Sequence, residues 1–209
     1  MNGIALQQSN SELLLGCWIE DDLKWCKQME SLISKLVGRL GAIAHLRYIC
    51  PFNVRKTLAE GLFSSILVYC LPLFGGMDQG MIKEVQVLQN KAARLVCNAP
   101  PRSNRAGMFE KLGWLTFNQL IYFHTLVSVF KVKMSNQPEY LAAKFNKISR
   151  NGRIIVPNYK LSLTGNSYCF RGSSQWNRLP YEVRSKSTVT SFKKALKNWI
   201  SDNIPRFLD

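Results

Sequence analysis

Residues 79–97 read QGMIKEVQVLQNKAARLVC, and their apolar and polar positions follow the 3.6-residue period of an α-helix. The apolar positions form one face: Ile82, Val85, Leu88, Ala92 and Leu95. The polar positions form an opposite stripe at spacings of three and four: Lys83, Gln86, Asn90 and Arg94. Asp78 precedes them as a suitable N-cap, because its short carboxylate can accept from free N–H groups. The sequence therefore predicts an amphipathic helix here.

Two further helices are expected before this one. Residues 23–48 repeat apolar side chains every three or four positions, from Met29 to Leu46. A second helix is expected to start at Asn53, as its cap, and to run to about Leu71. Its expected apolar stripe is Val54, Leu58, Leu62, Ile66 and Tyr69. Three such helices favour a small bundle, and residues 11–19 in front of it are interpreted as a buried strand.

The chain after Pro100 and Pro101 also favours helices. Residues 104–112 suit a short helix, and Thr116 with Gln119 forms a capping box for a helix to about Lys133. Another short helix is expected from Pro138.

Turn residues then separate two β-like runs, at 153–156 and 168–171. Thr188 or Thr190 would cap a last helix, with a face of Phe192, Ala195, Leu196 and Trp199. The expected fold class is mainly α: a helical bundle, then a helical extension with a short β-rich segment.

The charge of the chain is uneven. Among 209 residues there are 28 Lys and Arg against 13 Asp and Glu, which gives a formal net charge of +15. Residues 1–90 hold eight bases and eight acids, so the whole excess falls in 91–209. Such an excess points to a polyanionic partner, nucleic acid first and a membrane surface second.

A membrane partner is not expected. The uncharged run 61–77 is shorter than the ~20 residues of a spanning helix, and Pro72, Gly75 and Gly76 interrupt it. A core helix explains it better. The first residues lack a basic segment and a long apolar run, so no signal peptide is expected.

The sequence offers no complete catalytic or metal site. The six cysteines form no C-x-x-C pair and are interpreted as buried free thiols of a reducing compartment. His45 and His124 lie in apolar helical stretches and are interpreted as structural. Asp21 and Asp22 resemble a metal-binding pair, but acids at a helix start are explained by the helix dipole alone. No catalytic residue, metal ligand or cofactor is therefore expected.

Bases interleaved with aromatic residues after Lys91 favour nucleic-acid binding, because cations pair with phosphates and rings stack on bases. The alternative is a solvated basic surface over a core that holds the rings. The candidate binding residues are Lys83, Asn90, Lys91, Arg94, Arg102, Arg105, Arg150, Arg153 and Arg171. Asn90, Lys91 and Arg94 are expected on the exposed side of the 79–97 helix.

Seven segments resemble, in order, one family: the non-LTR (LINE-type, Jockey-like) retrotransposon reverse transcriptases. The segments are LGCWIEDDLKW (15–25), FSSILVYCLPLFG (63–75), QVLQNKAARLV (86–96), MFEKLGWL (108–115), PEYL (138–141), Arg150 with Arg153, and WNRLP (176–180) with Phe192 and Lys193. Glu20 stands where the family usually has aspartate, and the tryptophan usual soon after Gly75 is absent. The most specific segment is 86–96.

The resemblance implies the C-terminal part of such an RNA-directed DNA polymerase. Residues 1–20 would be a remnant of the palm edge, 21–100 a thumb-like helical bundle, and 101–209 a basic C-terminal extension. The implied partners are RNA or an RNA–DNA template–primer, and the upstream palm and fingers of a full-length enzyme. No residue matches the catalytic palm aspartates, which in the full-length enzyme would use Mg²⁺, so the chain alone is predicted to be inactive. The family alone implies an intracellular location and residence in the nucleus.

Two alternatives stay open. The chain could be a protein-interaction or structural module, with Trp176 to Pro180 packing on the bundle or docking a partner. It could also be a non-functional retrotransposon relic. Bases clustered on one face would favour nucleic-acid binding, whereas burial of the polar stripe of the 79–97 helix would favour the interaction module.

Overall fold

The computed structural model describes residues 9–74, 77–156, 158 and 165–204, and it confirms a mainly helical chain. The described residues also form one small antiparallel sheet. The first part comprises β1 (Ser11–Leu14), β2 (Cys17–Glu20), α1 (Cys26–Leu46), α2 (Phe52–Ala59), a π-helical turn (Glu60–Ser64), α3 (Ser65–Leu67), a 3₁₀ turn (Leu71–Leu73), α4 (Gln79–Cys97) and α5 (Arg105–Leu112). The second comprises α6 (Phe117–Ser135), α7 (Glu139–Phe145), α9 (Tyr168–Arg178), α10 (Tyr181–Arg184) and α11 (Val189–Asn203).

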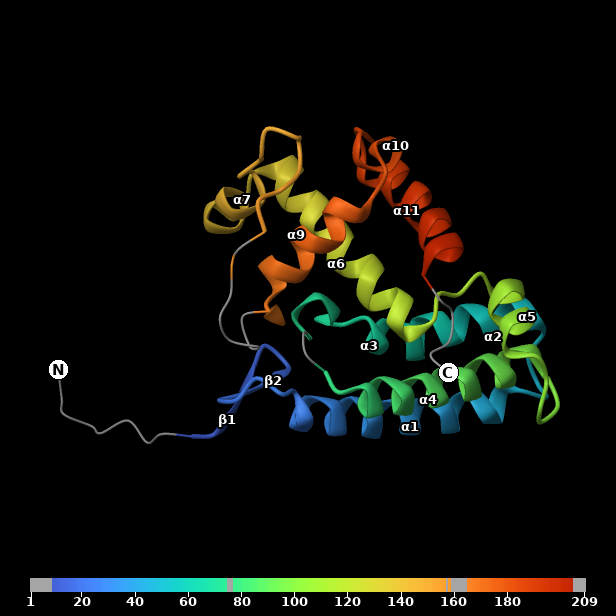
Figure 1. The fold of residues 1–209 in the computed structure, drawn as a ribbon. Coiled ribbons are helices and arrows are strands. Elements are labelled where there is room, and N and C mark those ends of the chain that lie inside the picture. The colour runs from blue at the N-terminus through green and yellow to red at the C-terminus, as the bar shows by residue number, and fades with distance from the viewer. Residues whose placement is uncertain (1–8, 75–76, 157, 159–164, 205–209) are drawn as a thin grey trace.

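Helices α1 and α4 lie side by side and form the lower layer in Figure 1. They run in the same direction, so their C-terminal ends meet where Arg47 Nε donates a hydrogen bond to Asn98 Oδ1. Arg55 of α2 ties this end together, donating to the carbonyl oxygens of Val96 at 2.9 Å and Cys50 at 2.6 Å. The expected helices at 23–48 and 79–97 are confirmed within a few residues.

The apolar stripe expected for the second helix is wrong. Its buried residues are Ala59, Phe63, Leu67 and Leu71, whereas Val54 and Tyr69 are exposed. The segment carries apolar residues at a spacing of four on two adjacent lines, so periodicity alone does not identify the buried one. The helix also begins at Phe52, after Pro51, rather than after an Asn53 cap.

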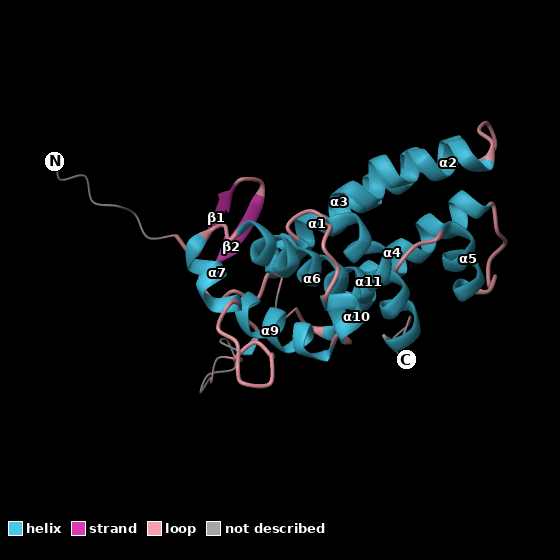
Figure 2. Ribbon diagram, turned by 90° about the horizontal axis from the view of Figure 1, so that it is seen from above, coloured by secondary structure: helices cyan, strands magenta, loops and turns pink. Residues whose placement is uncertain are grey.

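This same segment, Phe52–Leu73, is the one helical stretch among the described residues that is long and apolar enough to cross a membrane. The buried line contacts α1 and α4, while the second apolar line is only partly covered. Figure 2 shows α2 along the outer edge of the molecule. The high hydropathy of this helix thus comes from two apolar lines, of which one is buried in the core and the other is partly covered.

Residues 11–19 form a hairpin instead of one buried strand. Strand β1 pairs antiparallel with β2, and the turn residues Leu15 (φ 49°) and Gly16 (φ 79°) have the left-handed conformation of a tight hairpin turn. Leu15 is 85% exposed, and Cys17 is the only buried residue of the two strands. The hydroxyl of Tyr69 donates to the Leu15 carbonyl oxygen and fastens the turn to the helical layer.

The upper layer in Figure 1 consists of α6, α9 and α11 with the short α7 and α10. Its core is aromatic: Phe130 and Phe192 stack with ring centroids 4.1 Å apart, and Trp176 lies 5.8 Å from Phe192. The Thr116–Gln119 capping box at the start of α6 and the Thr188 cap of α11 are confirmed. Trp176 is buried in this core, as an anchor within the chain.

The expected β-rich segment is wrong at 168–171, because these residues begin helix α9 with Ser167 as its cap. Gly172 lies within this helix because α9 packs closely on its neighbours: a Cβ at this position would lie 2.8 Å from Val129 Cγ2 of α6. In the 153–156 run, only the isolated bridge between Ile148 and Ile154 has strand character. Pro157 and residues 159–164 lie outside the described part of the chain.

The two layers have separate cores that divide at α6. Met108, Phe109 and Leu112 of α5 belong to the lower core, which extends to Ile121. The upper core begins at Leu115. The division between the two cores therefore lies near residues 115–121, whereas the resemblance implies that the bundle passes into the extension at residue 100.

Alanine at two helical glycines should have opposite effects. A Cβ at Gly172 would lie 2.8 Å from Val129 Cγ2 and 3.2 Å from the ring of Phe145, and both are buried and rigid. We expect Gly172→Ala to lower the free energy of unfolding by about 1–3 kcal/mol. At Gly41 a Cβ meets nothing within 4 Å, so Gly41→Ala should raise it by about 0.4–1 kcal/mol. Urea unfolding measures both, and stabilisation by Gly172→Ala would contradict the close packing of α9.

Candidate nucleic-acid interface

A groove of about 410 Å³ runs between the C-terminal halves of α1 and α4. Its lining is mostly apolar, with Val37, Leu40 and Leu88 among the contributors. Three cations also line it: Arg47, which caps the C-terminal end of α1, and Lys91 and Arg94 from α4. An apolar floor beside three positive charges can accept an anionic chain whose body is partly apolar.

The cations of this groove are not neutralised by neighbours. The ion pairs that the described residues make involve Lys24 with Asp22 and Lys56 with Glu60, both outside the groove. Lys91 is exposed, and Arg94 is half-buried with its Nε lacking a hydrogen-bond partner. A partly buried guanidinium without a carboxylate leaves an uncompensated positive field in the groove.

Arg102 and Arg105 lie beyond the end of α4. Arg102 is exposed in the turn between α4 and α5, with a left-handed φ of 70°, and Arg105 is the exposed first residue of α5. This turn is at the end of the molecule where α1 finishes and α2 begins (Figure 1). Both arginines therefore extend the basic surface from the end of the groove.

Asn90 was expected on the exposed side of its helix, and this expectation is wrong: the residue is only 7% exposed. Its Oδ1 accepts from Gln86 Nε2 at 2.9 Å, and Gln86 Oε1 accepts from the N–H of Phe117 at 2.8 Å. The polar stripe therefore splits in two. Gln86 and Asn90 hold the start of α6, whereas Lys83 is exposed and Arg94 is half-buried in the groove; the neighbouring Lys91, outside the stripe, is also exposed. Lys83 lies eight residues before Lys91, so about 12 Å along the helix.

Arg171 is a strut between the layers and not part of an open binding surface. Its Nη2 donates to the Pro72 carbonyl oxygen at 2.8 Å, and its Nε donates to the Asn166 carbonyl oxygen at 3.1 Å. Burial lowers the pKa of its guanidinium from the ordinary value. The expectation that Arg171 continues a nucleic-acid path is therefore not supported by its position.

Arg150 and Arg153 are exposed, but they belong to the turn after α7 in the upper layer. The backbone N–H of Ser149 donates to the Arg153 carbonyl oxygen across this turn. The groove between α1 and α4 belongs to the other layer. The candidate residues thus form a set at the groove and a separate pair on the upper layer.

Sequence reasoning missed Arg47. It lies in the half of the chain with no net charge, and only the pairing of α1 with α4 brings it beside Lys91 and Arg94. The approach of Arg47 to Asn98 links positions 51 apart in sequence. No local signal in the sequence reports such a contact. Three exposed lysines of α11, Lys193, Lys194 and Lys197, were also outside the candidate set.

The described residues do not form a Mg²⁺ site. Asp22 forms an ion pair with Lys24 at 3.1 Å, and a hydrogen bond from the Lys24 backbone N–H holds the pKa of its carboxyl below the usual value. No three His, Cys, Asp or Glu side chains of the described chain gather around a point. Cys17 is buried, which raises the pKa of its thiol to about 11 and makes it a poor nucleophile at neutral pH.

Comparison of the chain with protein-family models, curated proteins and solved structures finds no match. The likeness to reverse transcriptases therefore rests on the quoted sequence motifs.

Removing the Arg171 strut should destabilise the chain. Arg171→Met keeps most of the side-chain length but removes both donors, so the partly buried Pro72 carbonyl loses its hydrogen bond. We expect a loss of about 1–3 kcal/mol in the free energy of unfolding. The exposed Arg150→Met is the matched control and should change it by less than about 0.5 kcal/mol. Equal effects of the two variants in urea unfolding would show that Arg171 has no structural role.

His124 should make stability depend on pH. Burial lowers the pKa of its imidazole below 6.5, and the positive charges of Lys193 and Lys131 lower it further. The unfolded chain therefore binds a proton at a higher pH than the folded chain does. Stability should be greatest above pH 6.5 and should fall as the pH decreases below it.

The measurement is the free energy of unfolding between pH 7.5 and 5.5. His124→Asn should flatten the pH dependence over this range, whereas the exposed control His45→Asn should leave it in place. If the pH dependence of the free energy of unfolding survives in His124→Asn, it arises from groups other than His124.

Proposed function

We propose that this chain is a nucleic-acid-binding module of the reverse-transcriptase type, without polymerase activity of its own. A template–primer or single strand would lie in the groove between α1 and α4. The observation that supports this best is the set of three cations without acidic neighbours in a mostly apolar groove. The groove includes residues of the 86–96 segment, the most specific part of the resemblance. In this proposal the helices α1 to α4 serve as the thumb.

The chemistry of the groove suits a nucleic-acid strand. Arg47, Lys91 and Arg94 would bind successive phosphates, and the apolar floor would contact sugars and base faces. Arg102 and Arg105 would extend the phosphate path beyond the end of α4. Such contacts do not read sequence, so the affinity would depend on salt more than on base composition.

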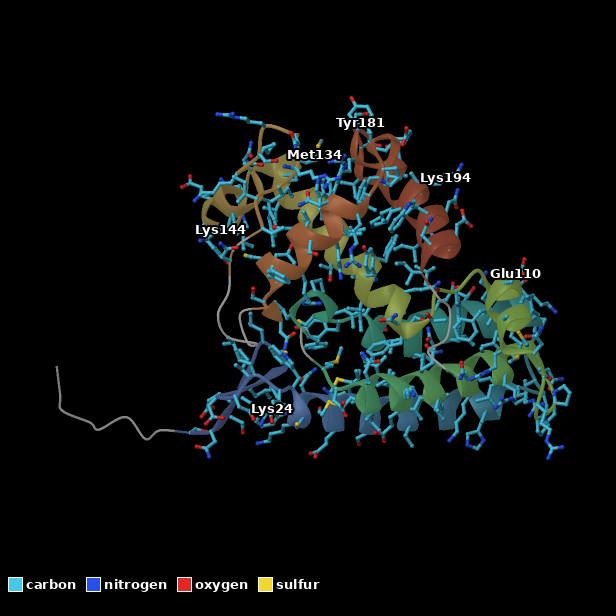
Figure 3. All side chains as sticks on the ribbon, viewed as in Figure 1. Lys24, Glu110, Met134, Lys144, Tyr181 and Lys194 are labelled. Carbon is cyan, nitrogen blue, oxygen red and sulfur yellow. The ribbon has the colours of Figure 1, made fainter. Side chains whose placement is uncertain are left out.

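Charge removal at Lys91 tests this proposal. Binding of a labelled RNA–DNA hybrid, followed by fluorescence anisotropy, should weaken as salt rises from 50 to 200 mM. Lys91→Ala should reduce the slope of log K against log salt by about one unit, because one phosphate contact is lost. Lys194→Ala removes an equal charge from α11 in the upper layer (Figure 3) and should leave the slope nearly unchanged.

The proposal fails if the unaltered chain shows no affinity for the hybrid or for single-stranded RNA at 50 mM salt. It also fails if the two variants change the slope equally, since binding would then reflect net charge alone.

A protein-interaction module is the second candidate. The burial of Asn90 favours it, because Asn90 and the partly buried Gln86 make hydrogen bonds within the chain instead of facing solvent. Under this alternative the same groove would take a partner protein. A chain that binds neither hybrid nor RNA but retains its fold would support it.

A further inference from the structure

A second cavity lies where the two layers meet, apart from the basic groove. It is a cleft of about 210 Å³ between the π-helical turn, the middle of α4, the 113–115 connection, the start of α6 and α11. Drug-sized ligands usually occupy about 300–1,000 Å³. The cleft is therefore the right size for a single flat ring system.

One buried group in this cleft lacks a partner. Gln89 is only 3% exposed, and its Nε2 donates to the Leu115 carbonyl oxygen at 2.9 Å. Its Oε1 is buried with no hydrogen-bond partner. A buried acceptor left unpaired costs about 1–3 kcal/mol, and most such groups in folded proteins are satisfied. A ligand N–H donor would remove this cost once the Gln89 amide turned its buried Oε1 toward the cleft that the residue lines.

Two charged side chains also line the cleft. Glu60 accepts from the indole N–H of Trp114 at 3.1 Å through Oε1, which leaves Oε2 able to accept from a ligand. Lys197 Nζ donates to the Gly113 carbonyl oxygen at 2.7 Å and keeps two further N–H groups. The acceptors of Gln89 and Glu60 therefore suit a ligand with N–H donors, and Lys197 suits a separate anionic group on it.

The remaining walls are apolar and partly aromatic. Trp114, Leu120 and Phe123 line the cleft, and the hydrogen bond from Trp114 to Glu60 fixes the indole. Aromatic walls favour a flat aromatic ligand, because rings stack on one another. A flat ring with N–H donors and an attached anion describes a nucleotide.

We propose that this cleft binds one nucleotide whose base carries an exocyclic amino group, with adenine or guanine as the best fit. The amino group donates to Gln89 Oε1 or the Glu60 carboxylate, the ring packs on Trp114 and Phe123, and the phosphate pairs with Lys197. The base belongs either to a free nucleotide or to an unstacked residue of a bound strand. In the second case the inference rests on the proposed nucleic-acid role.

Calorimetry with the full chain tests the base first. AMP should bind, and purine riboside 5′-monophosphate, which lacks only the amino group, should bind about tenfold more weakly because a buried acceptor stays unpaired. Adenosine, which lacks the phosphate, should also bind more weakly than AMP. Absence of AMP or GMP binding at millimolar concentration would overturn the proposal, as would equal affinity for AMP and the analogue without the amino group.

Two variants test the place of binding. Ser64→Phe fills the cleft that Ser64 lines, and should abolish AMP binding. Ser65→Phe adds the same ring to the adjacent exposed residue and should leave binding unchanged. A melting curve confirms that both variants fold. If both variants bind AMP equally well, the nucleotide lies elsewhere and the proposal is wrong.

The two sources of the base are separated with oligonucleotides. A single-stranded RNA with one 2-aminopurine reports unstacking by its fluorescence, and Ser64→Phe should suppress a rise on binding if a strand base enters the cleft. Lys91→Ala should weaken strand binding and leave AMP binding intact. Loss of hybrid binding with retention of AMP binding would contradict the proposed function alone, and the reverse would contradict the cleft alone.

Discussion

Two glutamine side chains of α4 hold the point where one core ends and the other begins. Gln86 accepts from the N–H of Phe117, and Gln89 donates to the carbonyl oxygen of Leu115. The first N–H groups of a helix have no acceptor within that helix. The side chain of Gln86 supplies the acceptor for the N–H of Phe117, the first residue of α6. Together with the Arg171 strut and the packing of α6 on the lower layer, these two hydrogen bonds position the upper layer and with it the cleft.

Elements whose signals are local could be predicted from the sequence. The Thr116–Gln119 box and the Thr188 cap are contacts within three residues, and both helices begin where expected. The buried line of Phe52–Leu73 could not be predicted, because a neighbouring line of apolar residues has the same spacing of four as Phe63 and Leu67. Residues 11–19 were misread for a related reason: an apolar run does not reveal that Leu15 and Gly16 turn the chain.

The candidate site was predicted less well than the fold. A basic residue looks the same in sequence whether it meets a phosphate or a carbonyl group. Arg171 reaches the Pro72 carbonyl across 99 positions, and nothing near Arg171 in the chain indicates that contact. Asn90 is polar, so the sequence places it on the surface, yet its amide accepts a hydrogen bond from Gln86 inside the chain. Arg47 was hidden by the balanced charge of the first half. The division of the chain into a neutral and a basic part thus describes its composition but not its surface.

The two apolar lines of Phe52–Leu73 have a consequence for synthesis of the chain. One line packs on α1, which precedes it in the chain, and on α4, whose last residue is Cys97. At about 5–20 residues per second, translation reaches that residue roughly one to five seconds after it passes Leu73. During this interval the nascent helix is apolar on both lines and long enough to resemble a membrane segment. Factors that bind apolar segments of emerging chains would meet this helix when α1 is already made but α4 is not.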